Sequence, residues 1–291
     1  MGMIVNLWRE LGKKHAGTGA RKKNKAVDES ARLYIELLKK CVSNSIFDDD
    51  LDLLRGKRAL DPQTGKVIMV EPVPVDANNK YYGTIWPSRA HTMIGMPRLD
   101  NIQHCIETVL EDGVPGDLIE TEVWRGGATI LMRGILKAYG VTDRKVWVAD
   151  SFEGLPEGDH NRYPPDANSE FHTYADLAVS FAEVAENFKR YDLLDDQVRF
   201  LKGWFRDTLP TAPIEKLAVM RLDGDMYEST MDALVNLYPK LSPGGFAIID
   251  DYNAVKACND AVNDFRKDRG ITAELVLIPG CGAFWRKARG E

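Results

Sequence analysis

From residue 116 to the C-terminus, short apolar runs alternate with longer segments whose apolar residues recur every three or four positions. The runs predict buried strands, and the longer segments predict amphipathic helices. The predicted strands are 117–121, 146–150, 197–202, 217–223, 246–250, 274–279 and 283–286. The predicted helices are 127–139, 181–190, 228–240 and 254–269. Alternation at this spacing indicates a mainly parallel sheet with helices on both faces.

The last two predicted strands differ from the others because only Gly280, Cys281 and Gly282 separate them. So short a connection predicts an antiparallel hairpin. An α/β sheet that ends in such a hairpin is typical of class I methyltransferases. We therefore expect an α/β protein with a Rossmann-like, seven-stranded, mainly parallel sheet and a C-terminal antiparallel hairpin, formed by a core domain at 116–291.

The first 115 residues lack this alternation. Residues 1–29 scatter basic side chains among Gly, Ala and Thr, which favours a disordered leader over a binding arm. Residues 30–115 are expected to form N-terminal helices and a lid loop. Within them, the apolar spacing predicts an amphipathic helix at 30–45, a long irregular loop at 46–90, and a helix at 97–111 with proline in its first turn.

Composition narrows the class of protein. The net charge of −6 argues against nucleic acid as a partner, because phosphate binding relies on a basic surface. The four cysteines are Cys41, Cys105, Cys258 and Cys281, and their spacing predicts neither a zinc ribbon nor a disulfide framework. The chain has no recognisable export signal and no 18-residue apolar stretch. We therefore expect a cytoplasmic protein with no membrane partner.

Acidic residues cluster where two predicted strands end. Asp223 and Asp225 follow one apolar run, and Asp250 and Asp251 follow the next. Parallel strands place their carboxyl ends at the same sheet edge, where ligands bind in α/β proteins. Carboxylates gathered there repel one another unless a cation lies between them, and Mg²⁺, Mn²⁺ or Ca²⁺ suits oxygen ligands. Each Asp alone also suits a helix cap or an Asx-turn, but the two clusters together favour a metal site.

The first two core strands indicate a nucleoside site. The first strand runs into a turn that ends in Gly126 and Gly127 before a helix, where a ligand can approach backbone N–H groups. The Gly-x-Gly-x-x-Gly fingerprint of dinucleotide sites is absent. The second strand ends in Asp150, which suits a ribose diol, and Phe152 can lie against an adenine. A helix cap and a core phenylalanine are the alternatives. Together these features favour an adenosine ligand without a pyrophosphate, such as S-adenosylmethionine.

Several longer stretches resemble the macrocin O-methyltransferase family, which includes the mycinamicin- and novobiocin-pathway sugar O-methyltransferases. They are 86–95 (WPSRAHTMIG), 116–127 (GDLIETEVWRGG), 147–154 (WVADSFEG), 203–210 (GWFRDTLP), 221–230 (RLDGDMYEST) and 249–252 (IDDY). The similarity runs from about residue 33 to the C-terminus. The resemblance implies a class I fold, S-adenosylmethionine and Mg²⁺ as cofactors, and methylation of a sugar hydroxyl on a macrolide- or aminocoumarin-type glycoside.

The resemblance also implies individual site residues. Asp223, Asp250 and Asp251 match the family's metal ligands, and Asp225 matches its proposed catalytic base, with His91 as the alternative base. The residues that match its cofactor contacts are Thr92, Met93, Glu120, Thr121, Glu122, Val123, Trp124, Asp150, Ser151, Phe152, Glu153, Gly154, Ser180, Trp204 and Asp223. Ser180 suits a plain helix N-cap equally well.

One position departs from the family pattern, which has glycine where this chain has Glu122. If the backbone there has a positive φ, a side chain costs about 1 kcal/mol or more. The carboxylate would also project toward the methionine portion of the cofactor. We expect Glu122 to weaken cofactor binding and Glu122→Gly to tighten it roughly tenfold. The alternative is a local backbone that tolerates glutamate.

The sequence therefore predicts a Mg²⁺- and S-adenosylmethionine-dependent O-methyltransferase, expected to form a homodimer through the 30–45 helix and the long loop. Two alternatives remain: methylation of a catechol-like small molecule, or a methyltransferase fold that serves as a binding module with cofactor binding impaired by Glu122. A phosphatase of the haloacid dehalogenase type also uses Asp-x-Asp after a strand. It is disfavoured because Met226 and Tyr227 follow the motif here.

Overall fold

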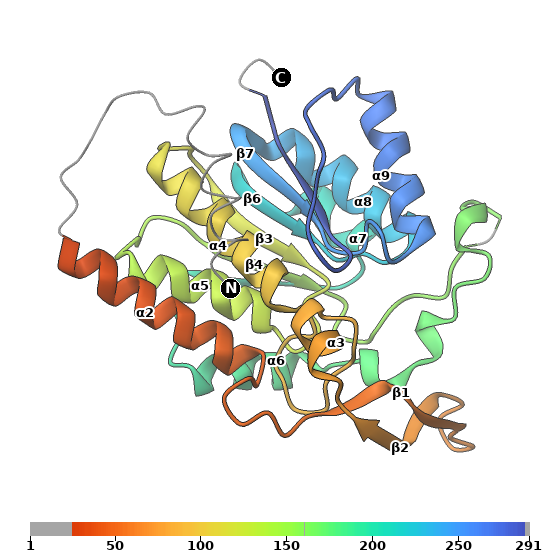
Figure 1. The fold of residues 1–291 in the computed structure, drawn as a ribbon. Helices are drawn as coiled ribbons and strands as arrows, with labels where there is room; N and C mark the ends of the chain where they lie inside the picture. Colours follow the sequence, from red (N-terminus) through yellow and green to blue (C-terminus); the bar gives the residue numbers. More distant parts are fainter. Residues whose placement is uncertain (1–24, 160, 289–291) are drawn as a thin grey trace.

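The computed structural model describes residues 25–159 and 161–288. Its centre is a seven-stranded sheet of order β5-β4-β3-β6-β7-β9-β8 (Figure 1). The strands are β3 (Asp117–Thr121), β4 (Val146–Asp150), β5 (Val198–Lys202), β6 (Leu217–Leu222), β7 (Leu241–Ile249), β8 (Val276–Leu277) and β9 (Ala283–Arg286). The first five run parallel, and β9 pairs antiparallel with both β7 and β8. The predicted fold class is confirmed.

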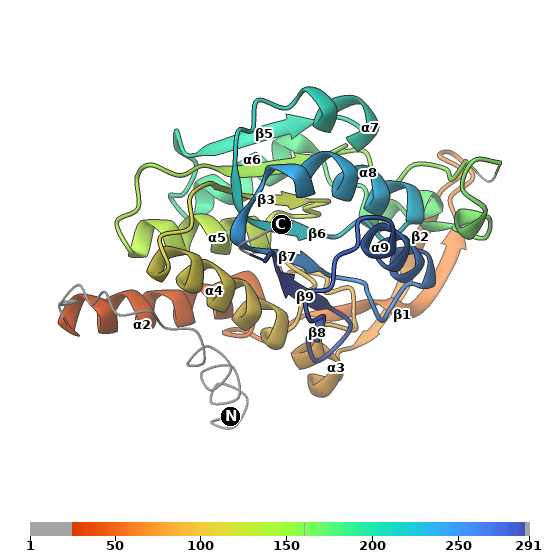
Figure 2. The same cartoon turned by 90° about the horizontal axis from the view of Figure 1, so that it is seen from above.

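Two hydrophobic layers hold helices on the faces of this sheet, because successive strand residues point to opposite sides. Leu118 packs into one layer and its neighbour Ile119 into the other. The helices of the first layer are α2 (Lys25–Val42), α4 (Met96–Glu111), α5 (Gly127–Ala138) and α6 (Phe181–Arg190). Those of the second are α7 (Phe205–Thr208), α8 (Tyr227–Leu237) and α9 (Lys256–Asp268). Figure 2 shows α4 and α5 on one side of the sheet and α8 and α9 on the other.

Most predicted bounds agree with the structure to within two residues, but β7 starts five residues earlier than predicted. The Ser-Pro-Gly-Gly segment at 242–245 has the composition of a turn, but it lies inside the strand. The pairing shifts there from Leu217↔Leu241 to Val219↔Phe246, so the extra residues form a bulge. Gly244 has φ +86°, which only glycine adopts without strain.

The N-terminal half differs more from the prediction. Helix α2 begins at Lys25, so residues 25–29 are helical, although they were expected to belong to the disordered leader. The rest of the expected leader, residues 1–24, lies outside the described residues. The predicted irregular loop at 46–90 is instead largely ordered. It contains an antiparallel hairpin, β1 (Leu51–Leu60) with β2 (Val67–Pro74), followed by the short helix α3 (Ala77–Tyr82). The hairpin forms its own two-stranded sheet beside the core sheet. Among the described residues, no helix is long and apolar enough to cross a membrane.

Candidate active site

The acidic residues predicted at two strand ends lie close together at the carboxyl edge of the sheet. Strands β6 and β7 are parallel neighbours, so Asp223 at the end of the first lies beside Asp250 and Asp251 at the end of the second. The Asp223 and Asp251 side chains are within hydrogen-bond reach of each other. Asp250 and Asp251 also approach Cys281, with one donor atom of each of the three within 4.8 Å of the others.

Two buried arginines hold this acidic cluster. Arg221 of β6 lies 3.0 Å from Asp223 Oδ2 and 2.5 Å from Asp250 Oδ1, and it also pairs with Glu120. Arg98 of α4 pairs with the other oxygen of Asp250 and donates to the Gly83 carbonyl at 2.5 Å. Neither arginine is among the site residues expected from the sequence. An arginine inside an otherwise apolar strand was the available signal for Arg221, since a buried guanidinium needs acidic partners.

The cluster is nevertheless short of positive charge, and this favours a cation. Burial, together with neighbouring carboxylates, raises the pKa values of Asp225 and Asp251 well above their usual range. Burial opposes ionisation of Asp223 as well, but Arg221 holds its pKa below the usual value. Asp251 Oδ2 is a buried oxygen without a hydrogen-bond partner in the described chain. Two carboxylates in mutual contact and an unpaired buried oxygen fit a divalent cation with oxygen ligands.

The other half of the site is the turn after β3. Its backbone has positive φ at Glu122 (+64°), Trp124 (+49°) and Gly126 (+85°). Glu122 therefore has the left-handed backbone in which a side chain other than that of glycine is strained. Asp150, at the end of β4, accepts hydrogen bonds from Val123 N at 2.7 Å and Phe152 N at 2.6 Å. Burial raises the Asp150 pKa to about 6 despite these bonds. Because it accepts from both N–H groups, the Asp150 carboxylate links the turn after β3 to the turn after β4.

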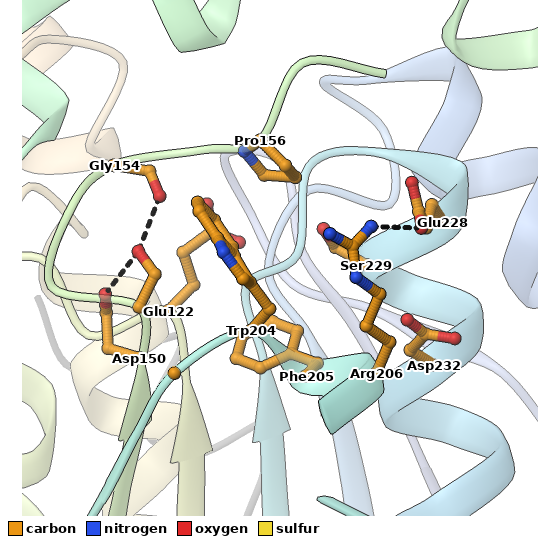
Figure 3. A pocket seen from close by; sticks show the side chains of 12 residues that line it. Glu122, Asp150, Gly154, Pro156, Trp204, Phe205, Arg206, Glu228, Ser229 and Asp232 are labelled. Carbon is orange, nitrogen blue, oxygen red and sulfur yellow. Dashed lines mark hydrogen bonds and ion pairs between the residues drawn. The ribbon is translucent and has the colours of Figure 1, made fainter. Parts of the chain in front are cut away.

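Two cavities open at this edge, and they share Glu122, Asp150 and Gly154. The larger, of about 310 Å³, contains the acidic cluster with Asp225 and is also lined by the expected contacts Met93, Trp124 and Asp223. The smaller is lined by Ser151 and Trp204 (Figure 3). The expected contacts that line neither cavity are Thr92, Glu120, Thr121, Val123, Phe152, Glu153 and Ser180.

Phe152, Glu120 and Ser180 have contacts within the protein. The Phe152 ring packs against Phe181 and Phe200 at centroid distances of 5.4 and 6.1 Å, and its contact with an adenine stays a prediction, while Trp204 lines the smaller cavity. Glu120 bonds to Thr129 and Arg221 within the core. Ser180 Oγ accepts from Glu183 N at 3.2 Å, which is the N-cap alternative. The alternative base His91 lines neither cavity, and burial lowers its pKa to about 4.

The hairpin and the long segment 155–179, here called the strap, meet at the rim of the larger cavity. Arg58 of β1 lies over both the Trp86 and the Tyr174 ring, 4.9 and 4.8 Å from their centroids, and the two rings contact each other edge to face. Arg58 also pairs with Asp176 at 3.1 Å. Trp124 Nε1 donates to the Asp176 carbonyl at 2.9 Å. The hairpin, the strap and the turn after β3 are thus joined at one point. Sequence reasoning missed this contact because its members are distant in the chain.

The strand order, the antiparallel last strand, the acid after the second core strand and the acidic cluster together define a class I methyltransferase. A likeness at TM-score 0.52 and 18% identity to the structure of the calicheamicin methyltransferase CalS11, covering 94% of this chain and 98% of that one, agrees with the fold. The chain belongs to the macrocin O-methyltransferase family (TylF), whose model matches residues 31–287. It is therefore an O-methyltransferase, and family membership implies S-adenosylmethionine as the methyl donor.

Relatives of known activity match over most of their length. The chain is 55% identical over 260 residues to the 8-demethyl-8-(2,3-dimethoxy-alpha-L-rhamnosyl)-tetracenomycin-C 4'-O-methyltransferase of Streptomyces olivaceus, covering 89% of this chain and 94% of that protein. It is 52% identical to the mycinamicin III 3''-O-methyltransferase of Micromonospora griseorubida, covering 88% and 96%. The structure of the O-methyltransferase NovP superposes with a TM-score of 0.79 at 48% identity, covering 89% of this chain and 100% of that one.

Proposed function

We propose that this enzyme transfers the methyl group of S-adenosylmethionine to a sugar hydroxyl of a natural-product glycoside, with Mg²⁺ held by Asp223, Asp250 and Asp251. The observation that carries the proposal is the larger cavity, which contains both the acidic cluster and Asp150. Donor and acceptor can therefore meet in one cavity. The names of the tetracenomycin and mycinamicin relatives support a glycoside as the acceptor.

A sugar hydroxyl is a weak nucleophile because it is barely ionised near neutral pH. Bound Mg²⁺ would supply a Lewis acid that lowers the pKa of the hydroxyl. Asp225 lines the same cavity, where its carboxylate would accept the hydroxyl proton. Arg98 and Arg221 keep Asp250 in place, because each pairs with a different oxygen of its carboxylate. Much of the acceleration would come from alignment of the reactants.

The lining of the larger cavity favours an acceptor whose sugar is already attached to its aglycone over a nucleotide-activated sugar. Leu54, Ile85, Trp86 and Phe171 supply apolar surface around the acidic floor. A nucleotide-activated sugar would bring phosphate charges toward several carboxylates, and like charges at close range are unfavourable. A neutral glycoside with an apolar aglycone meets no such repulsion. A catechol remains the second candidate acceptor, because it also offers two adjacent oxygens to a cation.

The test is an assay of S-adenosylmethionine and Mg²⁺ with a panel of antibiotic glycosides and simple catechols, read by mass spectrometry. A glycoside should gain about 14 daltons, the mass of one methylene group. EDTA should abolish transfer and Mg²⁺ should restore it, because the cluster otherwise lacks compensating charge. Asp250→Ala and Asp251→Ala should lose activity but still bind S-adenosylmethionine. Full activity in excess chelator would overturn the metal assignment, and faster catechol turnover would overturn the acceptor class.

The proposal includes a homodimer in the cytoplasm. Helix α2 supports it because Leu33 and Leu37, one turn apart, are 63% and 53% exposed on the face opposite the core. Exposed apolar pairs of this kind favour an interface. Light scattering coupled to size exclusion should give twice the monomer mass for the wild type, and Leu33→Glu with Leu37→Glu should give the monomer. A wild type that is monomeric would remove this part of the proposal.

A further inference from the structure

Glu122 occupies the boundary between the two cavities. It lines both of them, and Figure 3 shows its side chain among the residues of the smaller one. Its backbone N–H donates to the Ala149 carbonyl at 2.8 Å, which ties the residue to the end of β4. The left-handed backbone is unusual for a glutamate, and strained residues of this kind concentrate at functional sites.

Within residues 25–159 and 161–288, no side chain forms a hydrogen bond or ion pair with the Glu122 carboxylate. Burial and the negative charges of Asp225, Asp150 and Asp223 raise the pKa of the Glu122 carboxyl well above its usual range. An unpaired acid surrounded by acids is unfavourable, and such a group calls for a specific explanation. A cationic group of a ligand would supply the missing charge.

The neighbours of Glu122 indicate which cationic group. Asp150 lies at the end where the ribose of the donor is expected, and Asp225 lies where the acceptor hydroxyl is expected. In S-adenosylmethionine the positively charged sulfur joins the ribose to the methyl group that the acceptor takes. A residue between the ribose acid and the acceptor base therefore lies near that sulfur.

We propose that Glu122 is a cofactor-specificity residue whose carboxylate balances the charge of the donor sulfonium, so that the site prefers S-adenosylmethionine to the neutral product S-adenosylhomocysteine. This inference rests on the proposed function, since it requires this methyl donor. Methyl transfer removes the positive charge from the sulfur, and the product then faces an acid that it no longer neutralises. Glu122 thereby favours exchange of spent cofactor for fresh cofactor.

Calorimetric titration with each of the two ligands measures the preference as a ratio of dissociation constants, product over donor. The isosteric Glu122→Gln removes the charge and keeps the shape, so the ratio should fall at least fivefold, mainly through weaker donor binding. Glu157→Gln is the matched control, because Glu157 is exposed and lines neither cavity. Its ratio should equal that of the wild type.

Glu122→Gly is the second variant and suits the left-handed backbone, so it keeps the test available if the glutamine protein does not fold. Glycine also removes bulk, so both ligands should bind more tightly, the product by the larger factor, and the ratio should again fall. If the ratio is unchanged in whichever of the Glu122→Gln and Glu122→Gly proteins folds, the inference is overturned. A wild-type protein that binds neither ligand would overturn the proposed function itself, and the two failures are thus distinguishable.

Discussion

Arg221 determines how the acidic residues are arranged. Its guanidinium is buried in β6 and contacts Glu120, Asp223 and Asp250, which come from three adjacent strands. The acids were predictable from sequence because each follows an apolar run and parallel strands end at one edge. Their partner Arg98 was not predictable, since it comes from a helix more than a hundred residues earlier and only the folded chain brings it to Asp250.

At the scale of the residue, Asp225→Asn should lower kcat at least a hundredfold, because the amide cannot accept the hydroxyl proton and positioned bases contribute about 10²- to 10⁴-fold. Binding of S-adenosylmethionine and of Mg²⁺ should persist, since Asp223, Asp250 and Asp251 are unchanged. Steady-state kinetics and calorimetry measure the two effects separately. Asp268→Asn, at an exposed acid near the end of α9, is the control. Near-normal turnover in the Asp225 variant would remove it from the base role.

At the scale of the element, helix α8 depends on a distant cap. Its N-cap residue Met226 provides no side-chain hydrogen bond. Asp166 of the strap, 1% exposed, accepts from Tyr227 N at 2.7 Å and from Glu228 N at 3.0 Å. The acid also lies favourably at the positive end of the helix dipole. Helix periodicity predicted the existence of α8 but gave no sign of this cap, because the capping residue lies 61 positions away.

Asp166→Ala should therefore lower the free energy of unfolding by about 1 to 2 kcal/mol, the usual value of an N-cap. Urea unfolding monitored by circular dichroism measures the change. Asp159→Ala is the matched comparison, because that carboxylate accepts from the nearby Asn161 and Arg162 N–H groups at an exposed turn. Equal losses in the two variants would show that the cap adds nothing beyond a local turn.

The core strands and the hairpin strands were not equally predictable. Strands β4 and β6 are buried along their whole length, so they form unbroken apolar runs in the sequence. Strands β1 and β2 alternate poorly and are largely exposed or half-buried, and β2 contains two prolines. Such segments look like irregular loops in the sequence. A strand is recognised by the apolar or alternating pattern that burial imposes on it, and the hairpin buries few of its residues.

Across the whole molecule, the Arg58 contact joins the hairpin to the strap at the rim of the larger cavity, where we propose that the acceptor binds. Arg58→Ala should release the hairpin and raise the acceptor KM several-fold, because cation–π contacts and a partly buried ion pair are lost together. The dissociation constant of S-adenosylmethionine should change less than twofold. Lys57→Ala, the exposed neighbour, is the control. A larger effect on donor affinity than on acceptor KM would contradict this division of roles.

The hairpin pairs only with itself as a sheet, and it reaches the rest of the chain through two isolated bridges, Asp52↔Pro87 and Val67↔Tyr174, and through side chains such as Arg58. Its sequence can therefore change without altering the register of any core strand. Leu54 nevertheless lines the larger cavity. Substitutions in the hairpin can therefore reshape this wall of the cavity while the core strands and the acidic cluster stay unchanged.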